Sequence, residues 1–224
     1  MNRISIAIDG PGGAGKSTVA KALAGKYGFA YVDTGAIYRT IGLAVLRAGA
    51  SPTDEDQVEP VLRSSSVDLD YDETGLQHML LNGEDVSREI RLPEISSYAS
   101  KVSAHPAVRA ALLELQREQA RKRSVVMDGR DIGTVVLPDA TLKIFLTASP
   151  EVRAQRRYNE LKQRGTPQPY EEVFREMQER DLRDTTRAAA PLKPAPDAVT
   201  VDTSELNFEE VITELSRLVE GKLQ

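Results

Sequence analysis

A glycine-rich run between an apolar segment and a helical segment constrains the fold of this chain more than any other feature. Residues 10–17 are Gly-Pro-Gly-Gly-Ala-Gly-Lys-Ser and fit the pattern G-x-x-x-x-G-K-[ST] at every fixed position. A β-branched run at residues 4–8 precedes the loop, and a helical pattern at residues 16–27 follows it. Glycines let successive N–H groups point inward, and the helix start adds its positive dipole end. The pattern therefore predicts a phosphate-binding loop in the first unit of an α/β fold.

The loop predicts a site for a nucleoside triphosphate and magnesium. Lys16 can reach the β- and γ-phosphates as a point charge, and the Ser17 hydroxyl can ligate Mg²⁺. The loop does not name the second substrate, because P-loops serve kinases, motors and switches alike. The candidate triphosphate-binding residues of the loop are Gly10, Pro11, Gly12, Gly13, Ala14, Gly15, Lys16, Ser17 and Thr18.

Composition excludes several other kinds of site. The 224 residues include no cysteine and two histidines, so thiol nucleophiles, Cys zinc sites, iron–sulfur clusters and multi-histidine metal sites are ruled out. A net charge of −5 makes the chain a poor general binder of nucleic acid or anionic membranes. The first apolar stretch is too short for a signal peptide, and no segment has the roughly 18 uninterrupted apolar residues of a membrane span. We expect a soluble, cytoplasmic protein.

Apolar runs alternate with helical patterns along most of the chain, which indicates a doubly wound parallel sheet. Pro106 is expected to break the third helical pattern. The predicted strands lie at residues 4–8, 30–33, 124–127, 142–146 and 199–201. The predicted helices lie at residues 16–27, 36–47, 93–123 and 208–223, with a charged helical region at 150–187 that is divided near residues 165–169.

A different pattern interrupts this alternation. Val67, Leu69 and Tyr71 alternate with polar residues, and Asn82-Gly83 is a strong hairpin signal. We therefore expect a small antiparallel sheet at residues 66–90, inserted in the α/β chain.

Two motifs follow the second and third predicted strands, at the sheet end where the loop lies. Arg39 and Arg130 can each grip a phosphate with a planar fork, and Thr34 can donate a hydroxyl. Asp131 can accept from an amino group. The carboxyl ends of parallel strands line the ligand crevice of an open α/β sheet, so these residues are candidates for binding an acceptor. The simpler interpretations are a solvated helix charge for Arg39, a helix N-cap for Thr34 and a salt-bridged turn at residues 128–131.

The charged region after the fourth strand carries arginines at helical spacing. One set at spacing i, i+4, i+7 is Arg180, Asp184 and Arg187, which would share one helix face. A second pair, Arg153 and Arg156, is three residues apart and would also share a face. A surface ladder of ion pairs would have this pattern. A hinged lid would have it too, because arginines that close over transferring phosphates stabilise their charge and exclude water.

Taken together, these motifs resemble those of the bacterial cytidylate kinase family, which are P-loop nucleoside monophosphate kinases. The motifs that carry the resemblance are the P-loop, Asp-Thr-Gly-Ala-Ile-Tyr-Arg at 33–39, the inserted sheet, Asp-Gly-Arg-Asp-Ile-Gly at 128–133, and Glu-Arg-Asp-x-Arg-Asp at 179–184 with Arg187. The resemblance implies transfer of the ATP γ-phosphoryl group to CMP or dCMP by a monomer, in pyrimidine nucleotide metabolism. It also implies a three-layer P-loop NTPase fold. Its parts are a core of residues 1–63, 101–150 and 188–224, an NMP-binding insert at 64–100 and a helical lid at 151–187.

The resemblance also assigns roles to single residues. It places Arg39, Arg130 and Arg187 on the acceptor phosphate, Ser100, Arg109 and Asp131 on cytosine, and Arg180 and Asp184 on ribose. Thr34 stands where family members often have serine, and Arg153 and Arg156 are expected on the ATP side. Catalysis is assigned to Lys16, Arg130, Arg180 and Arg187. An Asp131 carboxylate suits cytosine, which presents an amino group where uracil presents a carbonyl.

Two other classes of function stay open at the level of sequence. One is a kinase for UMP, AMP or a non-nucleotide acid such as shikimate. The other is a nucleotide-dependent switch or partner-binding ATPase, with Met127-Asp128 as an acidic strand end. The chain lacks the Asn-Lys-x-Asp motif of guanine-specific switches, which argues against that class. The choice between CMP and dCMP, the donor triphosphate, the oligomeric state and the extent of closure are not set by these motifs.

Overall fold

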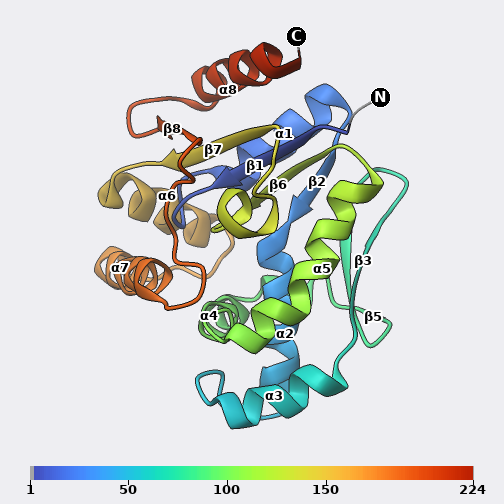
Figure 1. The fold of residues 1–224 in the computed structure, drawn as a ribbon. Helices are drawn as coiled ribbons and strands as arrows, with labels where there is room; N and C mark the ends of the chain where they lie inside the picture. Colours follow the sequence, from blue (N-terminus) through green and yellow to red (C-terminus); the bar gives the residue numbers. More distant parts are fainter. Residues whose placement is uncertain (1–2, 224) are drawn as a thin grey trace.

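A parallel sheet of five strands forms the centre of the computed structural model, which describes residues 3–223 (Figure 1). Met1, Asn2 and Gln224, which the sequence assigns to the core, lie outside the described residues. The spatial order of the strands is β2-β6-β1-β7-β8, and every neighbouring pair is parallel. All five predicted strands are confirmed with small shifts at their ends. Their bounds are β1 Ser5–Asp9, β2 Ala30–Asp33, β6 Val125–Gly129, β7 Leu142–Thr147 and β8 Val199–Asp202.

Helices cover both faces of this sheet, as the doubly wound pattern predicts. On one face, Ile6 and Ile8 of β1 pack with α1 (Lys16–Tyr27) and α8 (Phe208–Leu223). On the other face, Ala7 packs with Met127 and with side chains of α5 (Pro106–Lys122) and of the π-helical turn Ile132–Val136. Successive residues of a strand point to opposite faces, so β1 contributes to both cores. No helix in the part of the chain that the structure describes has the length and apolar character needed to cross a membrane.

A second core lies beside the main sheet and holds the inserted segment. The expected antiparallel sheet is confirmed and contains three strands, β3 Val67–Tyr71, β4 Gln77–Leu81 and β5 Glu84–Asp85. It packs with α2 (Thr34–Arg47), α4 (Pro93–Val102) and α3 (Glu55–Ser64). Helix α3 was not predicted, because Pro60 in its interior obscures the periodicity; Asp54 caps it by accepting from the Asp56 N–H.

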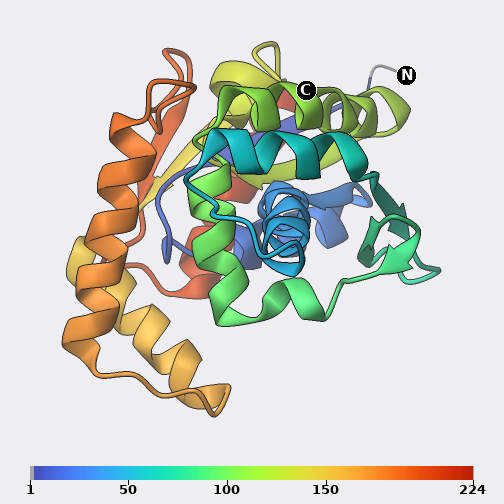
Figure 2. The same cartoon turned by 90° about the horizontal axis from the view of Figure 1, so that it is seen from below.

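The charged region forms two helices, α6 (Pro150–Gln163) and α7 (Tyr170–Thr186), which Figure 2 shows at the left of the view, with the small sheet at the right. Arg187 lies just beyond α7 with an extended backbone. The expectation that Arg180, Asp184 and Arg187 share one helix face is therefore wrong for Arg187. Beyond Arg187 the chain folds back along the end of the helix, where the Leu192 N–H donates to the Asp184 carbonyl at 2.7 Å. The predicted break at Pro106 is confirmed and separates α4 from α5.

Helices α2 and α4 cross closely at a glycine, which gives a test of their packing. A Cβ added to Gly42 would lie 2.9 Å from the Ala99 backbone nitrogen, and backbone cannot move aside cheaply. Gly42→Ala is expected to lower the free energy of unfolding by about 1–3 kcal/mol, measured by denaturant titration. Gly25→Ala in α1 is the control, because its added methyl group meets nothing within 4 Å and should stabilise the helix by about 0.5–1 kcal/mol. A Gly42→Ala protein as stable as the wild type would contradict this account of the crossing.

Candidate active site

Two cavities meet at the glycine loop. The larger cavity measures about 1110 Å³ and runs from the loop to the segment before α8 and to α6. The smaller cavity measures about 340 Å³ and runs from the loop to α4 and the turn after β6. A group passing from one ligand to another would cross the residues that line both, which are Gly12, Gly13, Gly15, Ser17, Thr18, Asp33, Arg39, Ser96, Glu160 and Arg180.

The loop requires glycine where it leaves β1. Gly10 has φ +147°, and a Cβ there would lie 1.9 Å from the Leu146 carbonyl oxygen on β7. Further along the loop, the Lys16 ammonium curls back and donates to the Pro11 carbonyl at 2.7 Å. Burial, and then the charge of Arg130, lower the pKa of Lys16 well below its ordinary value. An anion bound in the loop would raise the pKa of Lys16 again. The burial and charge around Lys16 therefore favour a phosphate ligand.

A carboxylate at the end of β6 faces the start of α1. The Ser17 hydroxyl donates to Asp128 Oδ2 at 2.7 Å, and the Tyr31 hydroxyl donates to Oδ1 at 2.9 Å. Burial raises the pKa of Asp128, and the charge of Asp33 adds to the shift. Hydroxyl and carboxylate oxygens are the hard donors that Mg²⁺ prefers. Within residues 3–223, no group of three or more acidic or histidine side chains is placed to hold a metal. The donor set therefore fits a magnesium ion that takes most of its ligands from phosphates and water.

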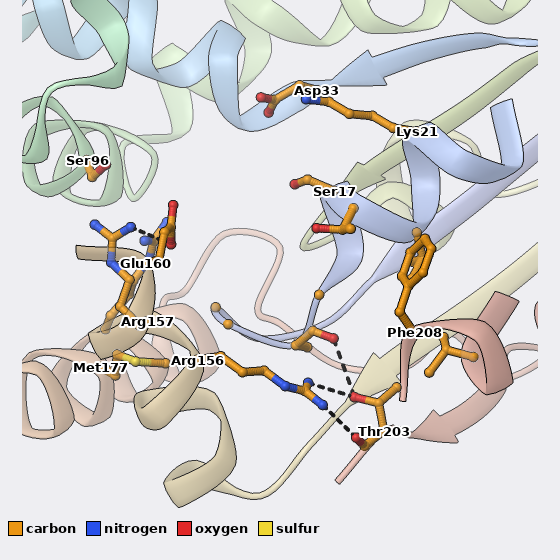
Figure 3. A pocket seen from close by; sticks show the side chains of 18 of the residues that line it. Ser17, Lys21, Asp33, Ser96, Arg156, Arg157, Glu160, Met177, Thr203 and Phe208 are labelled. Atoms are coloured by element: carbon orange, nitrogen blue, oxygen red, sulfur yellow. Dashed lines mark hydrogen bonds and ion pairs between the residues drawn. The ribbon is translucent and has the colours of Figure 1, made fainter. Parts of the chain in front are cut away.

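The two arginines of α6 that were predicted on the ATP side lie in different places. The Arg156 guanidinium lines the larger cavity and donates to the Thr203 hydroxyl at 3.0 Å and carbonyl at 2.7 Å (Figure 3). Arg153 is buried beneath the loop, where it donates to the Gly12 carbonyl at 3.1 Å and pairs with Asp181 at 2.7 Å. Of the residues that were predicted to bind ATP, three line neither cavity: Gly10, Pro11 and Arg153. The geometry thus gives Arg153 a contact with the loop itself.

The smaller cavity brings together every residue that was predicted to bind an acceptor. They come from α2, α4, α5, the turn after β6 and the end of α7, so segments far apart in the sequence converge here. The lining includes Thr34, Arg39, Ser100, Arg109, Arg130, Asp131, Arg180, Asp184 and Arg187.

Asp131 is one of the buried carboxylates that line this cavity. It is buried, pairs with Arg109, and has Arg187 Nη2 at 3.6 Å from Oδ1. The Arg109 guanidinium lies over the Tyr38 ring, 5.6 Å from its centroid. The Ser100 hydroxyl is buried and has no hydrogen-bond partner within residues 3–223. A buried hydroxyl without a partner is costly in a folded protein, so its presence here indicates a ligand atom.

Arginines crowd the region between Asp131 and the loop. Arg130 Nε donates to Asp184 at 2.9 Å, and Arg180 lies 4.0 Å from the same carboxylate oxygen. Burial, followed by the charge of Arg130, lowers the pKa of Arg180 to about 10. Close cations of this kind repel one another until an anion binds between them, so the cluster is suited to phosphate.

Asp33 and Arg91 are functional candidates that sequence reasoning missed. Arg39 Nη2 donates to Asp33 Oδ2 at 2.7 Å, and Arg91 Nη1 donates to the same oxygen at 2.8 Å. Burial alone would raise the pKa of Asp33, but the two arginines hold it below its ordinary value. Asp33 begins the motif at residues 33–39, which was a usable signal. Arg91 lies in a short 3-10 helix after the small sheet, and nothing in its local sequence marks it.

Thr34 lies at the base of the smaller cavity. Its hydroxyl donates to the Asp128 carbonyl at 2.7 Å and so ties α2 to β6. The N-cap of α2 is Asp33, whose side chain accepts from the Ala36 N–H. The simpler interpretation of Thr34 as the helix cap is therefore wrong. Its oxygen keeps a lone pair for a ligand.

Comparisons with known proteins find a matching family model, related sequences and a similar fold. The family model described as cytidylate kinase matches residues 6–221. The cytidylate kinase of Caldanaerobacter subterraneus subsp. tengcongensis is 54% identical, with 93% of this chain and 91% of its own covered. That of Caldicellulosiruptor bescii is 48% identical, with 97% and 96% covered. A crystal structure of an uncharacterized protein from Eubacterium ventriosum has the same fold, with a TM-score of 0.54 and 14% identity over 97% of this chain and 99% of its own.

Proposed function

The chain belongs to the cytidylate kinase family, and we propose that it transfers the γ-phosphoryl group of ATP to CMP or dCMP. The products are ADP and CDP or dCDP. The observation that carries the proposal is the pair of cavities that meet at the P-loop. One is lined by the P-loop and by arginines that can bind a triphosphate, and the other combines a carboxylate for an amino group with arginines for a phosphate.

The P-loop, α1 and α6 hold the donor. Backbone N–H groups of the loop and the Lys16 ammonium bind its phosphates, and Arg156 lies where the rest of the nucleotide enters. Arg153 acts beneath the loop by fixing the Gly12 carbonyl. Magnesium, when bound with ATP, neutralises phosphate charge. Ser17 would ligate it, and Asp128 beside Ser17 would accept from its water ligands.

The smaller cavity holds the acceptor in line with the donor. Arg39, Arg130 and Arg187 bind its phosphate, and Arg180 and Asp184 bind the sugar. Asp131 accepts from the cytosine amino group, while Ser100 and Arg109 donate to the ring acceptors. The attacking atom is already an anionic phosphate oxygen, so no strong general base and no covalent enzyme intermediate are needed. Lys16, Arg130, Arg180 and Arg187 stabilise the charge on the transferring group.

We assign the moving parts to the segments that the sequence set apart. Residues 151–187 act as a lid, because α6 and α7 bring Arg156 and Arg180 to the two cavities. Residues 64–100 act as the NMP-binding insert, which carries Ser100 and Arg91. The remaining residues form the P-loop core. The monomeric state and the cytoplasmic location stay predictions.

An acceptor panel tests the proposed function. Purified protein with ATP and Mg²⁺ is expected to release ADP with CMP and dCMP, and far more slowly with UMP, AMP, GMP or shikimate. Turnover on another acceptor would keep the kinase but overturn the assignment of Ser100, Arg109 and Asp131 to cytosine. Slow hydrolysis that no acceptor stimulates would favour a switch or ATPase and overturn the proposal.

A further inference from the structure

A buried carboxylate outside both cavities joins the two halves of the site. Asp9 is the last residue of β1, directly before the P-loop, and it is 4% exposed. Its Oδ1 accepts from the Ile132 N–H at 2.8 Å, and its Oδ2 accepts from the Gly133 N–H at 2.7 Å. These N–H groups start the π-helical turn that follows Asp131, and they have no earlier carbonyl of that turn to pair with. Asp9 therefore caps this turn from a strand more than a hundred residues earlier.

The acids at the ends of the two central strands serve different partners. Asp9 of β1 is paired with Gly129 of β6, and Ile8 is paired with Asp128. Because side chains alternate along a strand, Asp9 and Asp128 point to opposite faces of the sheet. Asp128 faces Ser17 on the α1 side. Asp9 faces the turn that carries Asp131.

We propose that Asp9 is a positioning residue for the acceptor base, and that its carboxylate fixes the turn at residues 131–133 so that Asp131 meets cytosine. This rests on the proposed function. Both oxygens of Asp9 accept from backbone N–H groups of the turn, so Asp9 positions Asp131 without touching the acceptor base itself. The remaining anchor of Asp131 is its pairing with Arg109 and Arg187, and each of those side chains is itself offered to the ligand. Because Asp9 holds the backbone of the turn, the side chains of Asp131, Arg109 and Arg187 remain free to bind the ligand.

The surroundings of Asp9 are charged on several sides. Lys16 at the start of α1 favours its ionised form, and Asp131 opposes it. Lys143 of β7 packs beside Gly133, but its ammonium is paired with Asp197. On β6, Asp128 lies on the other face. Burial, the largest influence, raises the pKa of Asp9 to about 6, although both amide donors act to lower it.

Asp9→Asn tests the proposal because it keeps the shape of the side chain and turns one acceptor into a donor. One of the two N–H groups then loses its partner, so the turn loosens. The KM for CMP is expected to rise about tenfold and the preference for CMP over UMP to fall about tenfold, while the KM for ATP stays within about twofold. Ser124→Ala is the matched control. The Ser124 hydroxyl accepts from the Ile4 N–H at 3.0 Å and so joins β1 to β6 at their N-terminal ends, which lie away from Asp9. The variant should leave the KM for CMP and the preference for CMP over UMP unchanged.

The wild-type enzyme provides a second measurement if Asp9→Asn fails to fold. The ratio of kcat/KM for CMP to that for UMP is expected to fall between about pH 7.5 and about pH 5.5, because protonation leaves Asp9 one strong acceptor oxygen. The ratio cancels the titration of the acceptor phosphate, which both substrates share. Unfolding would not mimic this. A carboxyl with a raised pKa stabilises the fold most below its ordinary pKa and loses that contribution as pH rises through about 6, so acidification strengthens the fold through Asp9.

The outcomes separate the two proposals. Wild-type turnover confined to CMP and dCMP keeps the proposed function whatever the variant does. A folded Asp9→Asn protein with unchanged KM for CMP and unchanged selectivity would overturn the role of Asp9, as would equal rises in the KM for ATP and for CMP. A wild-type selectivity that is flat across the pH range would do the same where the variant does not fold. A fall in selectivity on acidification, absent from Asp9→Asn, supports the role.

Discussion

Replacing Lys16 by alanine is expected to lower kcat about a thousandfold, with a smaller effect on the KM for CMP. The ammonium is buried in the loop and donates to the Pro11 carbonyl. Burial and the charge of Arg130 lower its pKa, because both destabilise the charged ammonium. A bound phosphate would offset this cost. Lys16 binds the transferring group most strongly in the transition state, where negative charge develops. Removing Lys16 is therefore expected to lower kcat more than it raises KM.

The control for this variant comes from the same helix. Lys26→Ala removes an exposed ammonium in the last turn of α1, which pairs with Glu220 at 3.3 Å, and it should leave turnover unchanged. Lys16→Arg should not restore activity, because a planar fork does not replace a compact point charge in a closed loop. Single-turnover measurements with saturating ATP separate the chemical step from binding. A Lys16→Ala enzyme that kept kcat within about tenfold of the wild type would contradict this role.

The parts of the fold that follow local rules were predictable from the sequence. The five core strands are short β-branched or apolar runs between helical patterns, and their parallel order follows from that alternation. The hairpin at Asn82-Gly83 was marked by its turn residues, and Asn82 does adopt a positive φ. The P-loop was marked by glycines, a lysine and a serine at the spacing of a phosphate-binding loop. In each case the signal lies within a few residues of the feature.

The parts of the site that depend on distant partners were not predictable in this way. Arg91 becomes relevant only because the small sheet carries it to Asp33. Asp9 was visible only as a polar residue at the end of a strand, since its partners are more than a hundred residues away. Ser100 and Arg109 were assigned by the resemblance, because a serine and an arginine on helices carry no local mark of function. Their convergence on one cavity is a property of the tertiary structure.

The second large effect is expected for Asp131→Asn, which should reduce kcat/KM for CMP about a hundredfold and nearly abolish the preference for CMP over UMP. Asp131 is buried, lines the smaller cavity and pairs with Arg109 and Arg187, so its oxygens are acceptors that two arginines hold in place. Cytosine places an amino donor against them, whereas uracil would place a carbonyl there and leave two acceptors facing each other. An asparagine amide presents a donor as well as an acceptor, so it can accept either base.

The comparison that decides the role of Asp131 is the ratio of kcat/KM for CMP and UMP in the variant and in the wild type. A general loss of stability would lower both values together and leave the ratio, because the two nucleotides share sugar and phosphate. Asp85→Asn serves as the control, since Asp85 is an exposed carboxylate of the small sheet that pairs with His78 at 2.8 Å, and its ratio should equal that of the wild type. If Asp131→Asn kept the full preference for CMP, cytosine would have to be recognised by Ser100 and Arg109 alone, and Asp131 would serve only to hold its two arginines in place.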